Sequence, residues 1–256
     1  MLRALISLTV VVLIAFACTI CCAADDCRTY SDLSQRLLEH VKYGESYTSE
    51  KATLQNADPS VLYNELQTDS SKKAFWINLY NAFAQLHIQK NAMLYNDRTA
   101  FFQSKDFTVA GHTLSLNDIE QRMLRRAEPG FLPGFIRTLF MSEFMRKLSV
   151  DRIDPRIHFA LNCNARSCPP ILFYQPEKID EQLDRAALNY LKTSVVYDAK
   201  TNVVELPELF SWFSNDFGKR PGIIDLLRRY DIIEQKVKPI FTYTPWNWSP
   251  EPGRFN

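Results

Sequence analysis

The chain has 256 residues, in which 30 Lys and Arg balance 29 Asp and Glu, and 46% of the residues are hydrophobic. This composition is typical of a folded globular protein and excludes disorder as the main state. The 7 glycines and 13 prolines follow no collagen-like period. A formal net charge of +1 gives no basic field that would attract phosphates, so we expect no nucleic-acid partner.

The N-terminal residues have the pattern of a secretory leader. An uncharged apolar run over residues 4–17 follows Arg3 and gives way to small residues before Asp25. This pattern predicts a signal peptide over residues 1–24, cleaved after Ala24. The alternative is an uncleaved signal anchor, because the apolar segment reaches the lower length limit for a bilayer span. We expect a secreted or extracytoplasmic protein with no membrane association once the signal is cleaved.

The cysteines divide between the leader and the body of the chain. Three of the six lie in the leader, so the mature chain keeps Cys27, Cys163 and Cys168. In an oxidising compartment, a disulfide between Cys163 and Cys168 that closes a short loop is chemically reasonable. The alternative is that one of these thiols stays free for chemistry.

The first predicted elements are helical. Apolar residues at helical spacing predict helices over residues 31–43, 59–66 and 71–91, and a further helix that begins after Ser115. Turn residues around Gly111 predict a hairpin over residues 106–114.

Farther along, an alternation of apolar residues predicts a central strand over residues 154–163. Helices are then predicted over residues 177–191, 207–216 and 222–230, a hairpin over residues 194–206, and an ordered tail anchored by Trp246 and Trp248. No linker divides the body, so we expect a single α+β domain with helices packed around a small, mainly antiparallel sheet. Within the mature chain we distinguish an N-terminal helical segment, residues 25–70, from a main domain, residues 71–256.

The helix over residues 71–91 carries a narrow polar stripe. It is apolar nearly all round, which is typical of a buried helix. Asn78, Asn81 and Gln85 lie on one side of it. Buried amides need partners, so they either bond the backbone of neighbouring loops or, for Asn78 and Asn81, orient a substrate. Farther on, Glu120 projects beside the apolar face of its helix and is either a structural ion-pair partner of an arginine or a general base.

A histidine and two cysteines lie close together in the sequence. His158 falls within the predicted central strand, Cys163 at its end, and Cys168 in the loop that follows. A thiol becomes a good nucleophile when a nearby imidazole stabilises its thiolate, and an Asn or Asp then orients the ring. The alternatives are a core histidine and a small buried cysteine.

No cofactor or metal is expected. The four histidines are dispersed, and the mature chain has no CxxC or HExxH spacing. It also has no GxGxxG, P-loop or GxSxG motif, which leaves nucleotide cofactors and a serine nucleophile without support.

Four blocks of the sequence occur together and in a fixed order. They are Lys73–Ala82, the stretch Ser115–Arg125 with Ile119-Glu120, the block Asp154–Cys163 with Ser167-Cys168-Pro169-Pro170, and the closing Trp248-Ser249. In this order they resemble the domain of unknown function 547 (DUF547) family, most clearly over residues 72–198. The family is named for the absence of a known activity, and the resemblance implies that its members are often secreted. The positions that match its pattern are Asn78, Asn81, Glu120, Arg156, His158, Ser167 and Cys168.

Two hypotheses of function follow. The first is a secreted thiol-dependent hydrolase or acyl transferase that acts on an amide or ester of a small molecule or peptide. In this hypothesis Cys168 is the nucleophile, His158 the base, and Asn78 or Asn81 the orienting group or oxyanion donor. Glu120 completes the catalytic set, and the substrate is bound by Arg156, Arg166 and Ser167. The second is a non-catalytic secreted binding module in which Cys163 and Cys168 form a disulfide.

Overall fold

The computed structural model describes residues 29–126 and 141–256. The predicted signal peptide and Cys27 lie outside these residues. Among the described residues, no helix has both the length and the apolar character needed to cross a membrane.

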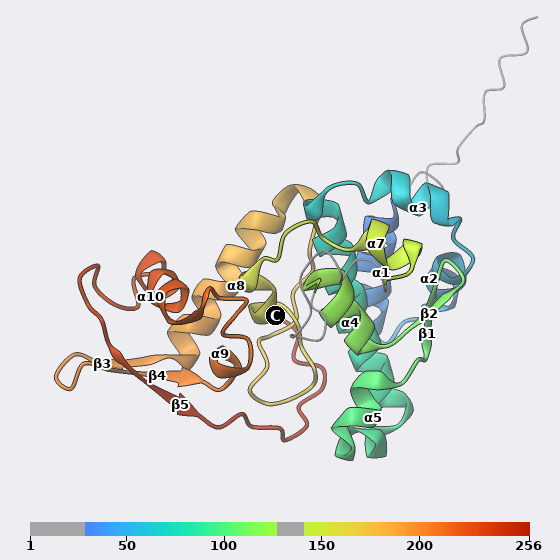
Figure 1. Ribbon diagram of the computed structural model, residues 1–256. Helices are drawn as coiled ribbons and strands as arrows, with labels where there is room; N and C mark the ends of the chain where they lie inside the picture. The colour runs from blue at the N-terminus through green and yellow to red at the C-terminus, as the bar shows by residue number, and fades with distance from the viewer. Residues whose placement is uncertain (1–28, 127–140) are drawn as a thin grey trace, which may run out of the picture.

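Helices make up most of the fold (Figure 1). The first half contains α1 (Tyr30–Tyr43), α2 (Thr48–Gln55), α3 (Pro59–Glu65), α4 (Asp69–Lys90), η1 (Ala92–Asn96), α5 (Arg98–Gln103), β1 (Phe107–Val109), β2 (His112–Leu114) and η2 (Asp118–Leu124). The second half contains α7 (Glu143–Leu148), η4 (Pro155–Phe159), η5 (Pro176–Lys178), α8 (Ile179–Ser194), β3 (Val196–Asp198), β4 (Val203–Pro207), α9 (Leu209–Trp212), α10 (Lys219–Arg229) and β5 (Ile240–Thr244).

The α+β class is confirmed. β1 pairs with β2, and β3 with β4, in antiparallel hairpins at the predicted places. β5, which was not predicted, joins β4 in parallel and makes a three-stranded sheet in the order β3-β4-β5. α2 was also not predicted. Figure 1 shows this sheet with α9 and α10 at one end of the molecule and α1 to α5 at the other.

Most predicted helix boundaries are close to those observed, because caps and apolar faces are local signals. The exception is the helix predicted over residues 207–216, which is limited to the four residues of α9. α1 ends at Gly44, whose φ of 67° is the left-handed conformation that favours glycine. α4 begins after Thr68, whose side chain accepts a hydrogen bond from the Ser71 amide. The cap therefore precedes the predicted start at Ser71.

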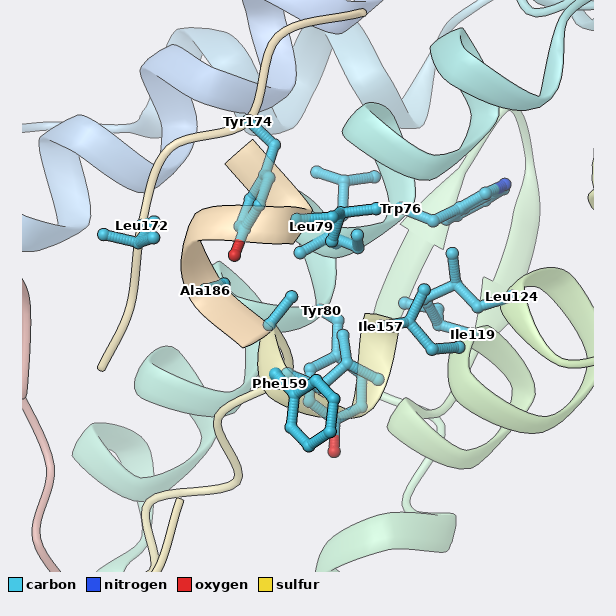
Figure 2. Packing of buried hydrophobic residues seen from close by; sticks show 14 of the residues in the cluster. Trp76, Leu79, Tyr80, Ile119, Leu124, Ile157, Phe159, Leu172, Tyr174 and Ala186 are labelled. Atoms are coloured by element: carbon cyan, nitrogen blue, oxygen red, sulfur yellow. The ribbon is translucent and has the colours of Figure 1, made fainter. Parts of the chain in front are cut away.

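α4 is the centre of the core. Phe75, Trp76 and Tyr80 on this helix are almost completely buried, and α1 packs along its length. Figure 2 shows Trp76, Leu79 and Tyr80 of this helix among the buried residues of the packed interior. The prediction that this helix is buried on nearly all sides is confirmed.

The predicted central strand over residues 154–163 is wrong. Pro155–Phe159 form a 3-10 helix, with Asp154 accepting a hydrogen bond from the Arg156 amide at its start. The amides of Ala160 and Leu161 both donate to Ile157 O. Residues 157–160 are all buried, so the apolar alternation does not separate a core face from a solvent face. Local capping by Asp154 and Pro155 decides the conformation instead.

The helix predicted after Ser115 has an unusual geometry. Ser115 and Asp118 form a reciprocal cap, with the Asp118 amide donating to Ser115 Oγ at 3.0 Å and the Ser115 amide donating to Asp118 Oδ2 at 3.1 Å. Residues 118–124 then wind as a π-helix, in which the Arg125 amide donates to Glu120 O. A single π-helical turn is rare and is frequently found beside functional sites.

The segment from Pro245 to Asn256 is ordered, as predicted. It runs alongside the loop that contains the two cysteines, with isolated bridges from Ala165 to Pro250 and from Ile171 to Phe255. Figure 1 shows the chain end in the middle of the molecule, between the helical part and the sheet.

Candidate functional site

A cavity of about 430 Å³ brings together residues from distant parts of the chain. We call it the aromatic cavity because it is lined by the aromatic side chains of Phe102, Trp212, Phe213, Trp246 and Trp248. Its chemically active lining consists of Tyr80, Glu120, His158, Cys163 and Cys168. The cavity thus contains the predicted nucleophile, the predicted base and the predicted carboxylate.

Cys163 and Cys168 face each other in this cavity. Their Sγ atoms are 2.9 Å apart, and the Cys163 amide donates a hydrogen bond to Cys168 Sγ at 3.2 Å. The loop closes tightly because Asn164 adopts a φ of 66° and the Cys168 amide donates to Ala165 O. The hydrogen bond to Cys168, followed by burial, raises the pKa of the Cys163 thiol well above its ordinary value. Cys163 is therefore protonated at neutral pH.

His158 is oriented by a carboxylate. Its Nε2 lies 2.9 Å from Oδ2 of Asp216, in the segment between α9 and α10, and Arg125 binds both oxygens of the same carboxylate. Burial raises the pKa of Asp216, but hydrogen bonds from His158 and Arg125 outweigh it, so the net pKa lies below the ordinary value. Because Asp216 is ionised, Nε2 of His158 is the donor. Nδ1 has no hydrogen-bond partner among the described residues.

The imidazole of His158 stays neutral near pH 7. Burial lowers its pKa, and this effect exceeds the opposing hydrogen bond and charge of Asp216. The ring stacks on Phe213, with centroids 4.1 Å apart and an interplanar angle of 19°. The Arg125 guanidinium also lies over the Phe213 ring, 4.5 Å from its centroid. The imidazole is thus held in one orientation and in the form that accepts a proton.

Glu120 projects from η2 into the aromatic cavity. The Tyr80 hydroxyl donates to its Oε2 at 3.2 Å, and Gln121 Nε2 donates to its Oε1 at 3.1 Å. Burial raises the pKa of Glu120, while Arg125 and Tyr80 partly oppose that effect. A carboxyl group that is protonated more readily than usual is a candidate proton donor.

The side-chain amides of two asparagines on α4 form hydrogen bonds with the backbone of neighbouring loops. Asn81 Nδ2 donates to Ala160 O at 3.0 Å, and its Oδ1 accepts the Asn162 amide at 2.9 Å. Asn78 makes the same two-bond pattern with the backbone of Tyr174. These two asparagines are fully buried and do not line the aromatic cavity.

A further layer of amides braces the cysteine loop. Asn162 Nδ2 donates to Pro169 O at 2.7 Å, and Asn164 Nδ2 donates to Ala84 O at 2.9 Å. Gln85 of α4 bonds Asn164 Oδ1 and also accepts the Gly253 amide. The loop is therefore tied to α4 on one side and to the C-terminal tail on the other.

Arg156 lies away from the aromatic cavity. Its guanidinium pairs with Asp154 at 2.7 Å, Asp180 at 2.7 Å and Asp184 at 2.9 Å, along a separate groove. Lys73 also binds Asp154, at 2.8 Å. All of these contacts join η4 to α4 and α8, so the structure does not bring Arg156 to the cysteines.

Arg166 and Ser167 line a second cavity, which Cys168 also lines. The Arg166 side chain is 63% exposed. Ser167 Oγ accepts a hydrogen bond from the Asn247 amide at 2.8 Å. Both predicted substrate-binding residues are thus next to the nucleophile but outside the aromatic cavity.

Sequence reasoning missed Asp216, Arg125 and the role of the tryptophans. An Asp or Asn was expected to orient the histidine, but Asp216 is 58 positions from His158, and no spacing rule joins them. The three indoles of Trp212, Trp246 and Trp248 have ring centroids 5.5–6.2 Å apart. Their number in a short C-terminal stretch was the available signal. No cluster of three or more metal-ligating side chains occurs within residues 29–126 and 141–256.

Comparison with known proteins gives one match. Searches of curated proteins and of solved structures return no significant similarity. The family model described as "Protein of unknown function, DUF547" matches residues 63–191, about half of the chain. This range holds Glu120, His158 and both cysteines of the aromatic cavity, whereas Asp216 and the three tryptophans follow it. The chain therefore belongs to the DUF547 family.

Proposed function

We propose that this protein is a secreted or extracytoplasmic thiol-dependent hydrolase or acyl transferase that acts on an amide or ester. Cys168 is the nucleophile, His158 the general base, and Asp216 the group that orients the ring. The proposal rests on one observation, namely that Cys168 lines the same cavity as His158, whose ring is bound to Asp216. The acyl class of substrate follows from the chemistry of a thiol nucleophile paired with imidazole.

The reaction starts with proton transfer. With Nε2–H bound to Asp216, the lone pair on Nδ1 of His158 takes the proton of the Cys168 thiol. Sγ attacks the carbonyl carbon, the bond to the leaving nitrogen or oxygen breaks, and the leaving group takes the proton back from His158. Water in a hydrolase, or an amine or alcohol in a transferase, then attacks the thioester and releases the Cys168 thiol.

Neighbouring groups support the charged states. The Cys163 amide and thiol both hydrogen-bond Cys168 Sγ, which stabilises a thiolate there. In its protonated form, Glu120 is a donor for the oxyanion that develops on the substrate. Asn78 and Asn81 keep no catalytic role in this proposal, because both ends of each amide bind loop backbone.

The test is alkylation of the folded protein by iodoacetamide across pH, with mass spectrometry assigning each labelled cysteine. We expect labelling of Cys168 that slows at least tenfold in His158→Ala, the range for loss of a general base. His112→Ala is the matched control, because His112 is an exposed histidine that stacks on Phe144. Equal labelling rates in the wild type and His158→Ala would rule out the thiol mechanism, as would labelling that requires unfolding.

A second candidate function has its own supporting observation. Sγ atoms 2.9 Å apart need to move together by less than 1 Å to reach the disulfide length of about 2.05 Å. In this alternative the protein is a non-catalytic binding module, and the aromatic cavity binds its ligand without reaction. Purified from an oxidising compartment, it would then have lost two hydrogens, and neither Cys163 nor Cys168 would be alkylated before reduction. Two free thiols in that preparation would exclude the binding-module alternative.

A further inference from the structure

We propose that the second cavity binds an anionic group of the substrate, a carboxylate or a phosphate, so that the substrate lies across Cys168 with one part in each cavity. The inference rests on the proposed function of Cys168. It adds a binding site and a substrate class that the catalytic geometry alone does not give.

The second cavity, which we call the arginine cavity, has a volume of about 490 Å³. Its walls come from the loop that contains Cys168, the last turns of α8, the ends of β4 and β5, and the C-terminal tail. Cys168 and Trp246 line this cavity and the aromatic cavity as well. Cys168 therefore lines both cavities, which is the arrangement expected where a bond between two substrate parts is cleaved or formed.

The charged side chains among the lining residues of the arginine cavity have one sign. Arg166 and Arg254 line it, and no Asp or Glu side chain occurs among its lining residues in the described part of the chain. Hydroxyl and amide groups complete the lining, including those of Ser167, Asn189 and Ser194. Guanidinium groups bind carboxylates and phosphates through paired N–H donors, and hydroxyls donate to the remaining oxygens.

The guanidinium group of Arg254 is bound to the backbone of the nucleophile. Its Nη1 donates to the carbonyl oxygen of Cys168 and to that of Arg166, both at 2.9 Å. The only carboxylate near either arginine in the described part of the chain is Glu251, 3.8 Å from Arg254 and 4.0 Å from Arg166. All three side chains are 42% exposed or more, so this pairing is weak and leaves most of the positive charge available.

The aromatic cavity has a different character. Indole and phenyl rings form most of its wall, and its charged residues have opposite signs, Arg98 and Glu120. Arg98 already stacks on Trp248, 4.6 Å from the ring centroid. An apolar or ring-shaped part of the substrate fits there, because aromatic walls bind such surfaces. The substrate we infer is thus an amide or ester with an apolar part on one side of the carbonyl and an anionic group on the other.

Two small alkylating agents of different charge measure the preference for an anionic group at Cys168. Iodoacetate and iodoacetamide both form a bond from Sγ to a CH₂ carbon while iodide leaves, and the thiol proton passes to His158. They differ in charge, because one carries a carboxylate and the other a neutral amide. We expect the ratio of the iodoacetate rate to the iodoacetamide rate at Cys168 to exceed that of free cysteine. Arg166→Gln should lower this ratio by about three- to tenfold, the effect of one nearby charge.

The variants separate charge from loop structure. Arg166→Gln removes a charge whose side chain has only the 4.0 Å contact with Glu251 among the described residues. Because Arg254 also holds two backbone carbonyls, Arg254→Lys, which keeps the charge, is compared with Arg254→Gln. Arg185→Gln, in the separate groove that also contains Arg156, is the matched control and should leave the ratio unchanged. Acetate and inorganic phosphate, added as competitors of iodoacetate, distinguish a carboxylate site from a phosphate site by which one slows labelling at the lower concentration.

The outcomes distinguish this inference from the proposed function. Cys168 labelling that depends on His158, with a ratio equal to that of free cysteine and unchanged by Arg166→Gln, would overturn the anionic subsite and leave the thiol mechanism standing. Failure of both reagents to label Cys168 in the folded, reduced protein would overturn both.

Discussion

Nε2 of His158 lies 2.9 Å from Oδ2 of Asp216, a residue 58 positions farther along the chain. This contact fixes which ring nitrogen carries the proton and leaves the other one as the base. Arg125 holds the second oxygen of the same carboxylate, at 3.1 Å. Three segments of the chain thus meet to set the protonation state of one imidazole.

Asp216→Asn should therefore lower the reactivity of the Cys168 thiol more than it lowers the stability of the fold. An amide at this position can present its NH₂ to Nε2, which favours the wrong tautomer. We expect the iodoacetamide rate at Cys168 near pH 7 to fall at least tenfold, as for loss of the base itself. Asp225→Asn is the control, because Asp225 is 73% exposed on α10. A rate in Asp216→Asn equal to that of the control would show that Asp216 does not orient the base.

The stability of the protein should fall as the pH drops below about 6.5, the ordinary histidine pKa. Burial lowers the pKa of His158 in the folded state, so the unfolded chain binds the proton at a higher pH than the folded one. Between the two pKa values, the free energy of unfolding therefore rises with pH. His158→Gln should remove this part of the pH dependence, as measured by urea unfolding from pH 5 to pH 8. An unchanged slope in that variant would contradict the assignment.

Glu120→Gln should stabilise the folded protein at pH 7. Burial raises the pKa of Glu120, so ionisation of this carboxyl lowers the free energy of unfolding as the pH rises through its folded pKa. The glutamine imitates the protonated form and keeps an acceptor for the Tyr80 hydroxyl. In urea unfolding, the stability difference between variant and wild type should shrink toward pH 4. A variant that is less stable than the wild type at pH 7 would contradict the raised pKa of Glu120.

Asn81→Ala should destabilise the fold by about 2–4 kcal/mol, because it leaves the Ala160 carbonyl and the Asn162 amide buried without partners. Asn96→Ala, at an exposed position in η1, should cost less than about 0.5 kcal/mol. Chemical denaturation of both variants measures the difference. A small effect at Asn81 would mean that the amide is free for another role.

Acid should weaken the ion pairs between η4, α4 and α8. Burial raises the pKa of Asp154, but hydrogen bonds and charges from Arg156 and Lys73 outweigh it and lower the pKa to about 2. The stabilisation is complete above the ordinary Asp pKa and is lost as the pH falls toward 2. At pH 7, Asp154→Asn should cost about 2–3 kcal/mol, and thermal unfolding at pH 2 should no longer distinguish the variant from the wild type.

Local patterns predicted what depends on local physics. The helix of α1, the start of a helix after Ser115, the turn at Gly111 and the buried character of α4 each follow from residues within a few positions of one another. The polar stripe on α4 was also predicted to need partners, and the backbone of Ala160, Asn162 and Tyr174 supplies them.

The errors and omissions involve contacts between distant segments. Alternation over residues 154–163 predicted a strand. Residues 157–160 of this segment are all buried, however, so the alternation does not distinguish a core face from a solvent face. β5 was missed because its residues are mostly exposed and its paired residues in β4 are 37 positions away. Asp216 was missed because nothing in a sequence specifies which loop meets the imidazole of a given histidine.

The C-terminal tail gives the site a dependence on the order of synthesis. Arg254 holds the carbonyls of Arg166 and Cys168, and Glu251 donates its amide to Asn164 O at 2.7 Å. These residues are made more than 80 positions after the cysteines that they enclose. While the ribosome is still adding them, the loop of Cys163 and Cys168 lacks its hydrogen bonds to Arg254 and Glu251, and Trp246 and Trp248 do not yet cover the cavity. The nascent chain therefore passes through an interval in which both thiols are open to oxidants, and chain completion closes it.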